Sequence, residues 1–304
     1  MSVAAILELG QLNSNILIGS LPESSVGVLK SNEGKTLAKE TIIKYTPSLA
    51  YAVLQELDKT IAGKDIKVKN EDSLHLKLIT IETEKENRRL LPIAQQFHSV
   101  ADARHAECHL SDLLANHSLG RYNLELKKNV TIDSFELTDS WRDDAGFIVT
   151  DRLIFTQSTF DSAKLISTLN PASQTIVPYT ASLFNAVSDF DNTVCGFARD
   201  AYLKLLLEKS NVLLAKSDSV DGMIVGNGDN INCIYAETIE IAHALIKAYI
   251  QKYKLKHVTL FTTANVWECE PIKSRQVYRR HTRAVPSALK WAKIYALNMG
   301  VHIV

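Results

Sequence analysis

The sequence has no excess of charge of one sign and no long apolar run, and we expect no secretory leader. Lysine plus arginine and aspartate plus glutamate both number 34 in 304 residues, so the formal net charge is zero. A balanced chain has no overall basic field to attract a phosphate backbone, and we expect no nucleic-acid partner. No apolar run approaches the ~18 residues of a membrane span, and the first residues lack a basic n-region. We therefore expect no membrane partner and a cytoplasmic location.

Cysteine is also scarce, and its placement excludes a disulfide framework. The four cysteines are far apart and form no C-x-x-C pair: Cys108, Cys195, Cys233 and Cys269. This usage fits reduced, mostly buried thiols. His105 and His109 have the i, i+4 spacing of metal ligands on a helix, but no clear third ligand follows. We interpret them as ordinary histidines and expect no metal.

The most regular stretch of the chain runs from Asp221 to Thr263. Its pattern predicts a strand, a Gly- and Asn-rich turn, a second strand, an amphipathic helix and a third strand. These elements are expected at 222–225, 226–230, 231–235, 237–254 and 257–262. A strand–helix–strand unit in a mixed sheet places strand ends around a pocket, so we expect a site there.

The remaining pattern predicts two domains of α+β class, each with a mixed sheet. The segment 158–180 is rich in Ser, Thr, Asn and Pro and is interpreted as a linker, which gives domains at 1–165 and 176–304. Helices are expected at 49–61, 101–115, 194–210, 267–272 and 288–298. Further strands are expected at 16–19, 66–68, 75–81, 90–95, 123–130, 147–155, 211–216 and 301–304.

Two acidic residues and an arginine precede this stretch and have two interpretations each. Asp189 and Asp191 flank Phe190, and Asp191 either caps a helix or lies at the mouth of an acceptor pocket, where a carboxylate would hold an amine. Arg199 either forms a structural ion pair with Asp191 or Asp229, or binds a ligand carboxylate with both nitrogens.

Polar residues at the turn and at the strand-to-helix joint complete the candidates. Asn227 and Asp229 suit a hairpin turn. Tyr235 and Glu237 follow a strand, and pockets of open sheets lie at the carboxyl ends of strands. The basic run 279–283 is interpreted as a solvated strand face, with a coenzyme phosphate contact as the alternative.

The second half of the chain contains several motifs that are similar to those of a known protein family. The motifs concerned are Phe190-Asp191, the V-x-G-x-x-R pattern of 194–199, the turn sequence of 221–229, the Tyr-Ala of 235–236 and the arginine segment of 278–283. Over residues 175–304 the chain resembles the C-terminal YitH/HolE-type domain of the GNAT acetyltransferases, as found in a set of nematode proteins. The element order of both halves is similar to the GNAT fold. The resemblance implies a tandem GNAT-like acyl-CoA N-acyltransferase fold with two domains.

The resemblance also implies an activity and its residues. The family holds the acetyl-CoA pyrophosphate on an R/Q-x-x-G-x-G/A turn before a helix. Its place in the first half offers Gln95, Gln96, Ser99, Ala101 and Arg104, without the central glycine. The implied function is an acetyl-CoA-dependent N-acetyltransferase that acts on a small-molecule amine or amino acid. The alternative is a catalytically inactive GNAT-like binding or interaction module.

The roles that follow from this resemblance fall on the second half. Asp191, Glu237 and Tyr235 are the catalytic candidates. A carboxylate or water must take the proton of the attacking amine, and Asp191 or Glu237 could be that base. Substrate-binding roles fall to Asp189, Arg199, Asn227 and Asp229. The sequence leaves a homodimer open.

Overall fold

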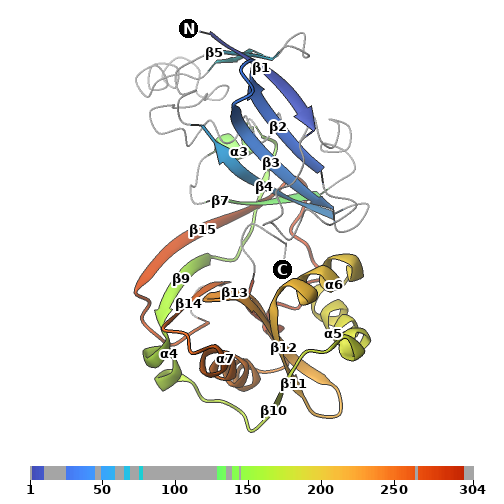
Figure 1. Ribbon diagram of the computed structural model, residues 1–304, viewed down its shortest axis with the longest axis vertical. Helices are drawn as coiled ribbons and strands as arrows, with labels where there is room; N and C mark the ends of the chain where they lie inside the picture. Colours follow the sequence, from blue (N-terminus) through green and yellow to red (C-terminus); the bar gives the residue numbers. More distant parts are fainter. Residues whose placement is uncertain are drawn as a thin grey trace. The chain divides into compact units, whose positions relative to one another are not determined.

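The structure is a computed structural model, and it divides the chain into two compact units (Figure 1). It describes residues 2–9, 25–44, 49–58, 65–68, 75–77, 129–134, 139–143, 145–263 and 266–297. Unit 1 comprises Met1–Asp151 and Arg279–Val285, and unit 2 comprises Arg152–Tyr278 and Pro286–Val304. Strand β15 (Lys273–His281) therefore begins in unit 2 and ends in unit 1. The sequence places its domains at 1–165 and 176–304.

Unit 1 is built on strands joined mostly in antiparallel fashion. Its described elements are β1 (Ser2–Leu9), β2 (Ser25–Ser31), β3 (Thr36–Lys44), β4 (Leu49–Leu57), β5 (Asp65–Val68), β6 (His75–Lys77), β7 (Asn129–Ser134), α3 (Ser140–Asp143) and β8 (Val149–Thr150). The strand order is β7-β4-β3-β2-β1-β5-β6. Strands β4 and β7 are parallel, as are β1 and β5. The strand predicted at 66–68 is confirmed.

The helix predicted at 49–61 is wrong, because residues Leu49–Leu57 form β4. This strand pairs with β3 from Ala50 to Leu57 and with β7 over its first four residues. Its alternate residues Ala50 and Ala52 are buried in one cluster with Trp141 and Phe147. Pairing on both edges outweighs a helical spacing that local propensity alone favours only weakly.

Unit 2 is a mixed sheet with helices on both faces (Figure 1). Its elements are β9 (Phe155–Asp161), α4 (Ser162–Thr168), β10 (Thr175–Pro178), η4 (Ala181–Leu183), α5 (Phe184–Cys195), α6 (Asp200–Lys209), β11 (Asn211–Lys216), β12 (Val220–Asn227), β13 (Asn230–Ala236), α7 (Ile239–Tyr253), β14 (His257–Thr263), the first part of β15, η5 (Trp291–Lys293) and β16 (Ile294–Ala296). The order β10-β11-β12-β13-β14-β9-β15 is antiparallel except between β13 and β14.

The strand–hairpin–helix–strand prediction for 221–263 is confirmed. The hairpin turns at Gly228, whose φ of 62° is the left-handed conformation that glycine adopts without strain. Helix α7 begins after Thr238, whose side chain accepts a hydrogen bond from the Ile241 N–H. Its buried face, which includes Leu245 and Tyr249, packs on the main hydrophobic core of unit 2.

Three other helix predictions in unit 2 are wrong. The expected helix 194–210 is two helices, because α5 ends at Gly196 with a φ of 77° and α6 begins at Asp200. Residues 267–272 form no helix, and 288–298 contain only the short η5 and then β16.

The linker expected at 158–180 is also wrong, since this segment contributes to β9, α4 and β10. Its hydroxyl side chains are used within the sheet, where Thr159 and Thr259 pair at 3.0 Å. The elements expected at 16–19, 90–95, 101–115 and 301–304 lie outside the described residues.

Candidate functional site

Among the parallel strand pairs of the described residues, β4–β7 in unit 1 and β13–β14 in unit 2 have the geometry that the GNAT resemblance requires, neighbouring parallel strands that stop pairing. We call the point where β4 and β7 part the unit 1 fork, and the point where β13 and β14 part the unit 2 fork. The β4–β7 register ends at Ala52↔Ile132, and the β13–β14 register consists of Asn230↔Thr259. Diverging strands leave backbone N–H and C=O groups that need other partners.

The unit 2 fork is filled by the chain itself. Strand β16 pairs with β13 at Ile234↔Ala296 and Tyr235↔Ile294. On the other side the Leu297 N–H donates to the Phe261 carbonyl of β14 at 2.7 Å. Since Ala296 and Leu297 are buried, β16 is part of the unit 2 core. A peptide strand thus occupies the gap between the two parallel strands.

The start of α7, which follows the end of β13 after two residues, is acidic. Glu237 and Glu240 lie on either side of its N-cap, Thr238, and Glu237 is ion-paired with Lys293 at 2.7 Å. The hydrogen bond from Thr238 is the main cause that lowers the pKa of Glu240. These carboxylates already complement the helix dipole, and they would repel a pyrophosphate.

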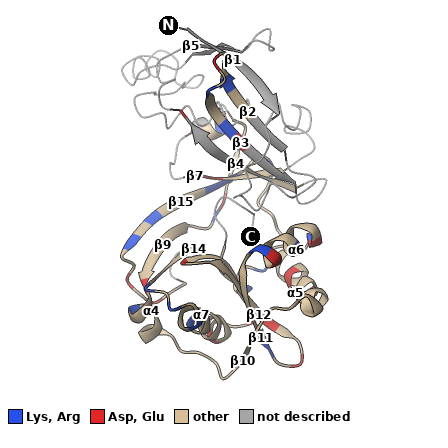
Figure 2. Ribbon diagram, in the orientation of Figure 1, with Lys and Arg blue, Asp and Glu red and all other residues tan. Residues whose placement is uncertain are grey.

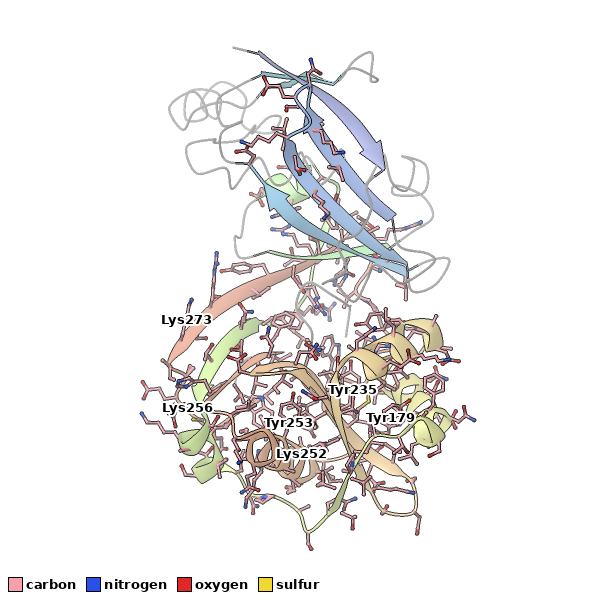
Figure 3. The ribbon with its side chains drawn as sticks, in the orientation of Figure 1. Tyr179, Tyr235, Lys252, Tyr253, Lys256 and Lys273 are labelled. Atoms are coloured by element: carbon pink, nitrogen blue, oxygen red, sulfur yellow. The ribbon has the colours of Figure 1, made fainter. Side chains whose placement is uncertain are left out.

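Beside this fork lies a buried ion pair between α5 and the loop that precedes α6. The Arg199 guanidinium donates from Nε and Nη2 to the two Asp191 carboxylate oxygens at 2.8 and 2.6 Å. Arg199 Nη2 also donates to the Tyr235 hydroxyl at 3.2 Å, and the Cys195 thiol lies 3.7 Å from Asp191. The Tyr235 side chain lies inside unit 2 and is fully buried (Figure 3).

This geometry settles one of the alternatives for Arg199 and Asp191. The structural ion pair between them is confirmed. Helix capping by Asp191 is wrong, because Asp191 lies in the last turn of α5, whose N-cap is Leu183. Burial would lower the pKa of Arg199, but the neighbouring Asp191 carboxylate raises that pKa well above its ordinary value. Burial also raises the pKa of Tyr235 well above its ordinary value, so its phenol stays protonated.

The other predicted site residues of unit 2 do not join this cluster. Asp189, Asn227, Asp229 and Glu237 are exposed. Asp229 accepts a hydrogen bond from the Thr259 N–H through its backbone carbonyl. The structure brings together Asp191, Arg199 and Tyr235, and the catalytic roles assigned to the predicted residues stay predictions. Gln95, Gln96, Ser99, Ala101 and Arg104 lie outside the described residues, in the chain segment that connects β4 to β7.

Unit 1 contains a second buried polar network, on the face of β7 opposite its apolar core. The Thr131 hydroxyl lies 2.8 Å from His281 Nδ1, and His281 Nε2 lies 3.2 Å from an Asp151 carboxylate oxygen. Two residues along the same face, Arg279 donates to both oxygens of Asp133 at 2.8 Å. The Thr131 and His281 side chains have no exposed area. Sequence reasoning missed this network.

The interpretation of 279–283 as a solvated strand face is wrong. Arg279, Arg280 and His281 are buried. The exposed basic residues of β15 are Lys273 and Arg275, at its other end (Figure 2).

No helix in the described part of the chain is long and apolar enough to cross a membrane. The same residues contain no cluster of three or more His, Cys, Asp or Glu that could hold a metal ion.

Comparison with known proteins supports the fold and leaves the activity open. A family model described as a domain of unknown function (DUF7596) matches residues 9–149. No curated protein matches the sequence significantly. A candidate acetyltransferase from Pyrococcus horikoshii aligns with a TM-score of 0.51 at 11% identity, over 91% of this chain and 79% of that one.

A second solved structure has the same level of similarity. It is the GCN5-related glucosamine N-acetyltransferase region of a fungal multi-domain GH3 β-N-acetylglucosaminidase, with a TM-score of 0.51 at 8% identity. This alignment covers 91% of this chain and 38% of that one. The chain therefore has the mixed α/β fold of the GNAT acyltransferases. The YitH/HolE subtype stays a prediction.

Proposed function

We propose that this protein is an acyl-CoA-dependent N-acyltransferase of the GNAT type, that it acts on a small amine, and that only unit 1 binds the coenzyme. The observation that carries this division is the position of β16. A strand that pairs with β13 and contacts β14 takes the hydrogen-bonding groups that a thioester tail would need in the unit 2 fork. In unit 2 the same fold would then serve as a binding or interaction module.

The chain order supports unit 1 as the coenzyme site. Among the described strands, none enters between β4 and β7. The segment that connects these parallel strands includes 95–104, where the resemblance places the pyrophosphate turn. A connection between parallel neighbours of this sheet class commonly contains a helix, and the first N–H groups of such a helix bind anions.

Calorimetric titration with acetyl-CoA tests the proposal. We expect one coenzyme per chain. The variant Arg104→Glu should weaken binding at least about tenfold, since it reverses a charge beside the pyrophosphate. The matched control Glu237→Gln, at the start of α7, should leave affinity unchanged. Tighter binding in Glu237→Gln with no effect of Arg104→Glu would move the coenzyme to unit 2.

Amide hydrogen exchange gives an independent location. Acetyl-CoA should slow exchange in β4 and β7, whose backbone groups gain partners beyond Ala52↔Ile132, and leave β13 and β14 unchanged.

Thiol release with a panel of amines then tests turnover. Release that depends on both acetyl-CoA and an amine supports the transferase. Binding without turnover supports the alternative, an inactive GNAT-like binding module. Absence of binding would exclude the transferase.

A further inference from the structure

We propose that Thr131, His281 and Asp151 form a proton relay at the unit 1 fork, which accepts the proton of the amine during acyl transfer. This inference rests on the proposed function and extends it, because an amine that attacks a thioester must lose a proton. The carboxylates of Asp191 and Glu237 are each ion-paired in unit 2. A base must therefore come from elsewhere.

The hydrogen bonds between the three side chains all run in one donor-to-acceptor direction. A carboxylate only accepts hydrogen bonds, so His281 Nε2 carries the hydrogen that faces Asp151 at 3.2 Å. The tautomer with its hydrogen at Nε2 has its lone pair at Nδ1, and in that tautomer the Thr131 hydroxyl, 2.8 Å away, donates to Nδ1. A hydroxyl within reach of an imidazole that a carboxylate orients is the arrangement that moves a proton from a reacting group to histidine.

The backbone holds these side chains in place. His281 is the last residue of β15 and pairs with Val149 of β8, and Asp151 follows β8 directly. The Asp151 N–H donates to the Arg279 carbonyl at 2.9 Å. On β7, the Val130 N–H donates to the Thr282 hydroxyl, and the Thr282 N–H donates to the Val130 carbonyl. The relay thus lies on paired strands, which keep its geometry fixed.

The relay lies beside the unit 1 fork. Thr131 pairs with Tyr51 of β4, one residue before the last paired position of these strands. Val130 and Ile132 point to the apolar cluster of unit 1, so Thr131 points to the other face. The hydroxyl is therefore next to the point where β4 and β7 part.

Other charged side chains lie near the relay. Asp133 is ion-paired with Arg279, and an Asp151 carboxylate oxygen lies 3.2 Å from His281 Nε2. Arg280 and Arg283 are the other charged residues of the same strand end, one buried and one exposed.

The reaction balances with acyl-CoA and an amine alone. The amine nitrogen forms a bond to the thioester carbon while its proton passes to the Thr131 oxygen. The original Thr131 hydroxyl proton passes to His281 Nδ1. The carbon–sulfur bond breaks, and the leaving thiolate takes up the proton that the imidazolium returns. The Thr131 hydroxyl is buried in this structure, so a bound substrate would have to open the unit 1 fork for the amine to reach it, and His281 and Asp151 would act through Thr131.

Steady-state kinetics with acetyl-CoA and an amine accepted by the wild type test the relay. His281→Gln should lower kcat by about 100-fold or more and leave the KM for acetyl-CoA unchanged. It should also remove the fall of kcat toward acid pH that a histidine causes. Asp151→Asn and Thr131→Val should act alike, and Thr131→Ser should retain activity because it keeps the hydroxyl.

A matched control separates chemistry from stability. Thr159→Val removes a hydroxyl pair from a strand of unit 2 and should leave kcat and its pH profile unchanged. The double variant Thr131→Val/His281→Gln should be no slower than either single variant, because residues that act as one unit are not additive.

The outcomes distinguish the relay from the proposed function. An active wild type whose folded His281→Gln variant keeps the wild-type kcat and pH profile overturns the relay alone. If His281→Gln does not fold, a Thr131→Val variant as active as Thr131→Ser overturns it. A wild type that acetylates no amine overturns the proposed function itself.

Discussion

Removal of the Arg199 guanidinium should be among the most damaging single changes in unit 2. The Arg199 and Asp191 side chains are 1% and 2% exposed, and two short hydrogen bonds join them. In Arg199→Met the carboxylate remains buried, with the Cys195 thiol at 3.7 Å as a weak donor. An uncompensated buried charge of this kind costs about 3–5 kcal/mol.

Removing the Asp191 carboxylate as well should restore most of the lost stability. A double variant, Asp191→Leu with Arg199→Met, replaces the pair by apolar side chains of similar volume. Such replacements are about neutral, so the double variant should regain most of the lost free energy of unfolding. The control is Lys293→Met, which breaks the half-exposed ion pair with Glu237 in the same unit and should cost at most about 1 kcal/mol.

Urea denaturation followed by circular dichroism measures these differences, and amide exchange in α5 and β13 assigns them to unit 2. The reasoning fails if Arg199→Met costs no more than Lys293→Met. It also fails if the double variant is as unstable as Arg199→Met alone, since the loss would then come from packing around the guanidinium.

Three further predictions concern the same unit, each checked by urea denaturation. Burial raises the pKa of Cys233 from 9.0 to about 12. The free energy of unfolding should therefore fall as pH rises between these values, by up to about 1.4 kcal/mol per pH unit. Cys233→Ala should make this slope shallower, and an unchanged slope contradicts the assignment. Gly196→Ala should lower the free energy of unfolding by about 2–4 kcal/mol, because φ is 77° and the new methyl group meets Ala288. Gly228→Ala, which has open space around it, should lower it by about 1–2 kcal/mol. Equal losses would argue against the contact with Ala288. Tyr235→Phe loses one hydrogen bond to the guanidinium and should cost about 1 kcal/mol; no measurable loss would mean that this bond contributes nothing.

The parts of the fold that sequence predicted well are those with local signals. Helix α7 has apolar residues at helical spacing, a threonine cap and strands on either side, and each signal lies within a few residues of the element it defines. Strand β4 failed because its spacing fits a helix, and only its pairing with β3 and β7 makes it a strand. Strand β9 failed because its serines and threonines suggest a loop until their partners on β14 and β15 are known.

The candidate sites also differ in how far apart their residues lie in the sequence. Asp191 and Arg199 are eight residues apart, so their pairing could be proposed from the sequence alone. Thr131 and His281 are 150 residues apart, and Asp151 is 130 residues from His281. The run Arg279 to His281 suggested exposed charge, and nothing local indicates that β7 supplies a carboxylate and a hydroxyl to neutralise it. Only the strand order reveals this network.

On the proposed function, the two forks would explain how one fold supports a catalytic and a non-catalytic unit. Wherever parallel neighbours part, their backbone groups need partners, and the source of those partners decides what the fork can do. In unit 2 the partners come from β16, which belongs to the core, and carboxylates flank the helix start where an anion would bind. That arrangement stabilises the fold of unit 2 and, on the proposed function, leaves no coenzyme site there. In unit 1 a histidine oriented by a carboxylate lies beside the point of divergence, on strands fixed by backbone hydrogen bonds. A thioester bound there would supply the missing hydrogen-bond partners and meet a base at the same place, which is the physical reason to assign the chemistry to unit 1.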